Sequence, residues 1–77
     1  MDEIYRMRDS LKPEAAYFME SGPFGENTVL IVIEEDRLKD VEKFIEKLDP
    51  DFDIAVITPE EFEEYRNVIE RGGRKLW

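Results

Sequence analysis

The chain has 77 residues, 20 of them acidic and 11 basic, so it fits one small domain, residues 1–77, with a net charge of −9 at pH 7. This charge disfavours nucleic acid and anionic membrane as partners, because both are negatively charged as well. Cysteine and histidine are absent, which excludes disulfides, zinc–thiolate sites and the usual nucleophile–base pairs of triad enzymes.

The first elements follow from the spacing of the apolar residues. Ile4, Met7 and Leu11 recur at helical intervals and Pro13 ends the pattern, which predicts an amphipathic helix over residues 2–11. AAYFME, residues 15–20, is predicted as a strand. TVLIVIE, residues 28–34, is predicted as a second strand with β-branched residues on both faces, which is typical of a central strand covered on two sides.

After Arg37 the apolar period changes from that of a strand to that of a helix. The residues between the apolar positions are charged, so the helix is expected to be amphipathic. Its apolar stripe consists of Leu38, Val41, Phe44, Ile45 and Leu48. DPD at residues 49–51 then predicts a turn, and FDIAVI at residues 52–57 predicts a third strand.

The last helix has a clear start signal. Thr58 can cap the helix, Pro59 suits its first position and Glu61 completes a capping box. Ile57 and Phe62 are placed to contact each other across this start, as in a hydrophobic staple.

The end of this helix is predicted at Gly72 in a left-handed conformation, which leaves RKLW as a short strand or tail. Four apolar residues of the helix are expected to point inward: Phe62, Tyr65, Val68 and Ile69.

The element order α-β-β-α-β-α predicts an α+β fold. Strands joined by a short loop pair antiparallel, whereas strands separated by a helix lie parallel through a crossover. The expected product is a small mixed sheet of three to four strands with helices packed on it. Its core is expected to contain Val29, Ile31, Ile33, Leu38, Val41, Phe44, Ile54, Val56, Phe62 and Ile69.

The loop ESGPFGEN, residues 20–27, lies between the first two strands. It lacks the spacing and the lysine of a Walker phosphate loop, and it does not open a helix as a dinucleotide fingerprint does. Pattern alone favours a hairpin loop. The acids at residues 34–36 likewise favour a solvated strand end beside a helix N-terminus.

The chain contains a characteristic succession of segments. A strand is followed by a Ser-Gly loop, a second strand ending in acids, a helix, the segment DFDIAVITPEEFEE and a terminal GGRKLW. Together they resemble the minimal nucleotidyltransferases, a polymerase-β-like family. The resemblance covers most of residues 15–77 and implies a nucleotidyltransferase-like fold. In that family a Gly-Ser loop with a second glycine holds the triphosphate, an Asp-x-Asp pair on the next strand binds magnesium, and a third carboxylate completes the site.

Carried over by position, the resemblance implies three phosphate-loop candidates, Ser21, Gly22 and Gly25. Glu20 stands where the family has its first glycine. Asp53 matches the third carboxylate and is therefore the candidate metal ligand.

The two magnesium positions of the family fall on Asn27 and Val29. Valine has no lone pair to offer a cation, and two-metal chemistry needs both bridging carboxylates. The resemblance thus implies a degenerate member that lacks the Asp-x-Asp motif and has no catalytic residues.

Three functions remain as hypotheses. The first is a catalytically degraded nucleotidyltransferase-like domain that acts as a protein-interaction or self-assembly module, with a protein partner or a second copy and no cofactor. The second is a binding module for a divalent cation such as Mg²⁺ or for a nucleotide, using Asp53 and the Ser21 loop. The third is an active nucleotidyltransferase with rearranged carboxylates.

The sequence also predicts a cellular setting. Its apolar runs stop at about six residues, far short of the ~20 that span a bilayer, and the acidic N-terminus is unlike a signal peptide. A cytoplasmic protein without a membrane partner is expected. The absence of cysteine, histidine and glutamine, with 40% charged residues, is typical of a thermophile.

Overall fold

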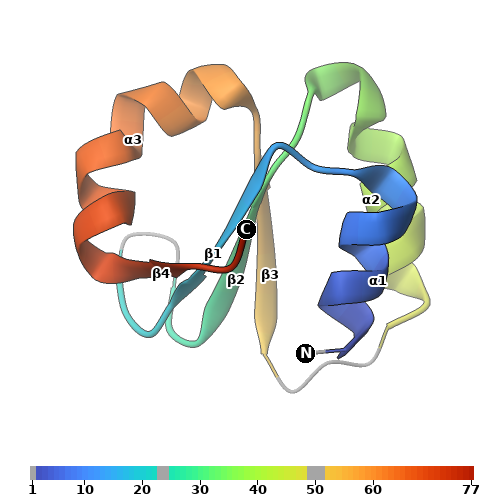
Figure 1. The fold of residues 1–77 in the computed structure, drawn as a ribbon, viewed down its shortest axis with the longest axis horizontal. Coiled ribbons are helices and arrows are strands. Elements are labelled where there is room, and N and C mark those ends of the chain that lie inside the picture. Colours follow the sequence, from blue (N-terminus) through green and yellow to red (C-terminus); the bar gives the residue numbers. More distant parts are fainter. Residues whose placement is uncertain (1, 23–24, 49–51) are drawn as a thin grey trace.

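The computed structural model describes residues 2–22, 25–48 and 52–77, which form three layers. The helices are α1 (Asp2–Leu11), α2 (Leu38–Glu46) and α3 (Pro59–Gly72), and a short 3-10 helix, η1 (Glu35–Arg37), precedes α2. The strands are β1 (Ala15–Met19), β2 (Thr28–Val32), β3 (Asp53–Ile57) and β4 (Gly73–Lys75). Figure 1 shows α1 and α2 on one face of the sheet and α3 on the other.

The four strands form one mixed sheet in the order β3-β2-β1-β4. β1 pairs antiparallel with both β2 and β4, whereas β2 pairs parallel with β3. The predicted α+β class, the element order and the two kinds of pairing are therefore confirmed, and the terminal segment supplies the fourth strand. The DPD turn lies outside the described residues.

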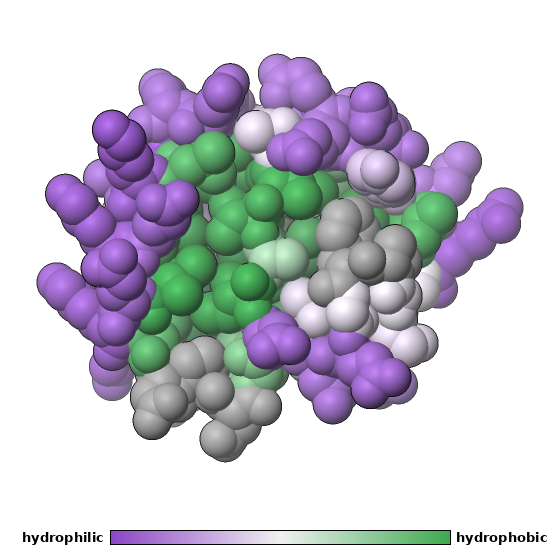
Figure 2. All heavy atoms as spheres, turned by 180° about the vertical axis from the view of Figure 1, so that it is seen from behind, coloured by the Kyte–Doolittle hydropathy of each residue, from purple (hydrophilic) through white to green (hydrophobic). Residues whose placement is uncertain are grey.

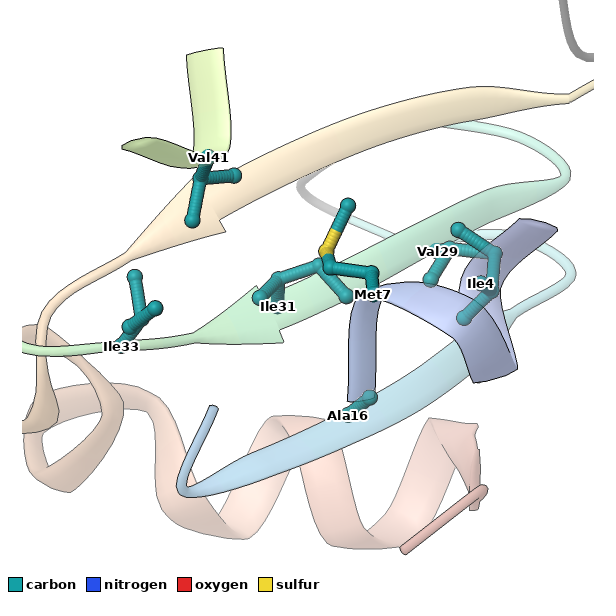
Figure 3. Packing of buried hydrophobic residues seen from close by; sticks show 7 residues of the cluster. All are labelled: Ile4, Met7, Ala16, Val29, Ile31, Ile33 and Val41. Carbon is teal, nitrogen blue, oxygen red and sulfur yellow. The ribbon is translucent and has the colours of Figure 1, made fainter. Parts of the chain in front are cut away.

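One apolar core fills the space between the sheet and the helices α1 and α2 (Figure 3). It is built by side chains from α1, β1, β2 and α2 and from the residue after β2: Ile4, Met7, Ala16, Val29, Ile31, Ile33 and Val41. A second core lies between the sheet and α3: Tyr17, Met19, Leu30, Val32, Ile57, Phe62 and Ile69. All five residues of β2 are buried, which confirms it as the central strand.

Four of the predicted core residues are only partly buried: Leu38, Phe44, Ile54 and Val56. They belong to α2 and β3, and β3 is at one end of the strand order. Since no further strand lies beyond β3 in the described residues, this end of the core stays partly open.

The start of α3 is confirmed. The Thr58 hydroxyl accepts a hydrogen bond from the Glu61 amide at 3.3 Å, and the Glu61 carboxylate accepts one from the Thr58 amide at 3.0 Å. Pro59 is the first helical residue. This capping box satisfies two amides that a helix N-terminus otherwise leaves unpaired.

The rest of α3 differs from the prediction in two ways. Tyr65 and Val68 are 43% and 46% exposed, because the helix contacts the sheet through a narrow stripe that includes Phe62 and Ile69. Gly72 is helical, and the cap is Gly73 in an extended conformation with φ −111°. The left-handed cap was wrong because the chain passes directly from α3 into β4.

Candidate functional site

The Ser21 loop closes on itself through its backbone. The Asn27 amide donates to the Glu20 carbonyl at 3.1 Å, and the Gly25 amide donates to the Gly22 carbonyl at 3.2 Å. Ser21 is exposed. In a phosphate loop such backbone amides point at the ligand. Here the amides of Asn27 and Gly25 donate to carbonyls of the loop itself. Gly25 has φ 121°, a conformation that favours glycine.

Asp53 begins β3, and its side chain is exposed. Its amide donates to the Asn27 carbonyl at 3.1 Å. In the parallel register Val29 lies beside Ile54, and both contact the core under α1 and α2. Because side chains alternate along a strand, Asp53 and Val29 lie on opposite faces of the sheet. The structure therefore does not bring the candidate metal ligand together with the second magnesium position of the family.

Carboxylates gather instead at the carboxyl ends of β2 and β3. Glu34, Glu35, Asp36 and Glu60 line an open hollow of about 560 Å³. A hydrogen bond with the Glu14 side chain, followed by repulsion from that carboxylate, raises the pKa of Glu34 above its usual value. The hollow is thus lined by carboxylates, and the charges of Glu60 and Asp36 also repel that of Glu34. Among residues 2–22, 25–48 and 52–77, no group of three or more carboxylates is arranged to hold a metal ion.

The outer edge of β3 is the second feature of this end of the molecule. The Asp53 amide donates to the carbonyl before β2, and the Ile57 carbonyl accepts from the Ile33 amide at 3.0 Å. Residues of a parallel strand direct their backbone groups to one neighbour and to the other in alternation. Ile54 and Val56 therefore direct their amide and carbonyl groups away from β2, where no described strand pairs with them.

This edge is also apolar. Ile54, Ala55 and Val56 are half-buried rather than covered. Figure 2, which views the molecule from the side opposite β1 and β4, shows a broad hydrophobic surface with hydrophilic residues along its left side and its top. Contiguous apolar surface of this kind marks interaction sites in soluble proteins. We call Ile54, Ala55 and Val56, together with the outward backbone groups of Ile54 and Val56, the β3 edge.

Sequence reasoning treated Ile54 and Val56 only as core residues. The apolar run without a charge after Asp53 was the available signal, but that run fits a central strand equally well. Only the strand order, which places β4 beside β1, leaves β3 at the end of the sheet.

Comparison with protein-family models, with curated proteins and with solved structures gives no match for this chain. Within the described part of the chain, none of the helices combines the length and the apolar character needed to cross a membrane.

Proposed function

We propose that this chain is a nucleotidyltransferase-like domain without catalytic activity, which binds another protein by accepting an extended strand at the β3 edge. The observation that carries the proposal is the apolar β3 edge, with which no strand of the described residues pairs. Main-chain hydrogen bonds to Ile54 and Val56 would supply affinity, and the half-buried side chains around them would be covered by the added strand.

The lack of catalysis in this proposal is supported by two features of the magnesium positions. Val29 cannot bind a cation, and Asp53 lies on the other face of the sheet. The test is incubation with labelled ATP, magnesium or manganese, and acceptors that include the protein itself. We expect no label transfer, and transfer that Asp53→Ala abolishes would overturn this part of the proposal.

Strand addition is tested with a synthetic eight-residue peptide of alternating valine and threonine. Binding should slow hydrogen exchange at the Ile54 and Val56 amides, since both would gain partners. Val56→Pro removes the outward amide without touching the bonds to β2, and should weaken binding at least about tenfold, equivalent to one lost hydrogen bond of ~1.4 kcal/mol.

Val56→Thr is the matched control, because it keeps the β-branched shape and the outward amide. It should bind the peptide about as well as the wild type. Equal binding by Val56→Pro, with unchanged exchange at Ile54 and Val56, would show that strands are not added at this edge.

A further inference from the structure

The β3 edge is acidic at both of its ends. Asp53 is exposed at the first residue of β3. Beyond the last residue, Ile57, lies the hollow lined by Glu34, Glu35, Asp36 and Glu60. The residues between the two ends, Ile54 to Ile57, carry no charge. The edge therefore consists of an apolar centre between two negative ends.

A second copy of this chain fits such an edge poorly. Pairing of β3 with itself in antiparallel orientation, the arrangement that a twofold axis through Ala55 would give, opposes Asp53 of each copy to Ile57 of the other. The acidic end of each strand then lies beside the acidic hollow of its partner. Each copy also carries a net charge of −9, so the approach of two copies is repulsive at long range as well.

We infer that the strand accepted by the β3 edge comes from a different protein and has a short apolar centre with lysine or arginine on both sides. This inference rests on the proposed function. The added strand would place one cationic end near Asp53 and the other near the acidic hollow that contains Glu60. This holds for both directions of the strand. Complementary charge of this kind raises the association rate and selects between partners.

The state of Glu34 supports the same partner. Its pKa is raised by a hydrogen bond with the Glu14 side chain, by the charge of Glu14, by desolvation, and then by the charges of Glu60 and Asp36. A cation placed in this hollow would relieve repulsion that the isolated chain leaves in place.

The test compares three peptides with the same valine–threonine centre and with two lysines, two serines or two glutamates at each end. At low ionic strength the lysine-ended peptide should bind about tenfold more tightly than the glutamate-ended one, measured by calorimetry. The ratio should fall toward one near ~1 M NaCl, where the screening length is only about 3 Å. The Ile54 and Val56 amides should be protected by all peptides that bind.

Three variants locate the effect. Glu60→Gln combined with Glu35→Gln should reduce the preference for lysine ends at least about twofold, because both carboxylates line the hollow. The control is Glu20→Gln, which removes a carboxylate beside β4 at the opposite edge and should leave the preference unchanged. Val56→Pro should weaken the binding of the lysine-ended peptide at least about tenfold, as for the valine–threonine peptide, which distinguishes strand addition from general attraction to an acidic protein.

The outcomes separate this inference from the proposed function. Equal binding of the three peptides, with Ile54 and Val56 protected, would overturn the charged partner and leave strand addition standing. Failure of every peptide to protect these amides would overturn both. A stable dimer in sedimentation equilibrium that Val56→Pro dissociates would identify a second copy as the occupant and would overturn the inference.

Discussion

β4 and β3 are the two edges of one sheet, and they differ in length and in side chains. β4 has three residues, one glycine and two cations, Arg74 and Lys75. β3 has five residues, of which only the first, Asp53, is charged. Short length and cationic side chains are the usual means by which proteins prevent an edge from pairing with another chain. β4 is short and carries two cations, whereas β3 is longer and has no cationic side chain.

This contrast within one sheet teaches that an open edge is not forced by the small size of the domain. The same chain protects one edge and leaves the other accessible.

The largest effect is expected at the beginning of β4. A Cβ atom on Gly73 would lie 2.5 Å from the Met19 sulfur and 2.8 Å from the Ile69 carbonyl. Gly73→Ala should therefore lower the free energy of unfolding by about 1–3 kcal/mol, measured by urea denaturation. Gly72→Ala is the matched control, because its Cβ would meet only the Met19 methyl at 3.7 Å. Equal stability of both variants would contradict the close approach of Gly73 in β4 to Met19 in β1.

The next effect concerns the residue that follows β3. Thr58→Ala removes the hydroxyl that accepts from the Glu61 amide, and should cost about 0.5–2 kcal/mol. The unfolding temperature should fall by about 4–8 °C per kcal/mol for a domain of this size. Thr58→Ser keeps the hydroxyl and serves as the control. An unchanged unfolding temperature in Thr58→Ala would argue against the capping box.

A third experiment makes β4 resemble β3. Arg74→Val combined with Lys75→Thr removes both cations from the β4 edge and leaves its pairing with β1 intact. We expect weak, concentration-dependent self-association in sedimentation velocity, since an uncharged edge can accept another strand. Arg6→Val removes a cation from α1, away from both edges, and should leave the sedimentation unchanged. Self-association of the control alone would refute the protective role of the β4 charges.

The smallest effect is expected in the hollow beyond β3. Folding raises the pKa of Glu34, so the ionised carboxylate destabilises the folded state. The protonated carboxyl favours folding, and this contribution is present at low pH and is lost as pH rises through the raised pKa. Glu34→Gln should raise the unfolding temperature at pH 7 by less than the Thr58→Ala loss. The difference should vanish below pH ~4, where the carboxyl is protonated in both states.

Glu46→Gln is the control for this variant, because it makes the same charge change on α2. It separates the local repulsion near Glu14 from the general benefit of lowering the net charge. A lower unfolding temperature for Glu34→Gln at pH 7 would contradict the assigned repulsion.

Local signals account for the features that were predicted from the sequence. The capping box at Thr58 and the buried run of β2 depend on neighbouring residues, and both are confirmed. The strand order depends on pairing between segments far apart in the sequence, since β4 near the end of the chain pairs with β1 near its beginning. No short pattern determines that pairing, so the position of β3 at an edge could not be predicted.

The candidate site was less predictable than the fold, for the same reason. The resemblance aligned Asp53 with a metal site, but the register of β2 and β3 decides the face on which Asp53 lies. The partner of Glu34 was also missed, because Glu14 is distant in sequence and comes close only through the pairing of β1 with β2. A shift of the register by one residue would move every side chain of β3 to the other face of the sheet, so the alignment of one residue with a family motif does not fix its face.

Trp77 is an intrinsic fluorescent probe of folding. It is the chain's one tryptophan, its ring centre lies 5.9 Å from that of Tyr5 on α1, and its backbone carbonyl accepts from the Ala16 amide. The indole N–H is buried without a hydrogen-bond partner among the described residues. Its fluorescence therefore depends on the docking of the first helix and of the last residues together, and a red shift on unfolding would record the separation of the two ends of the chain without any added label.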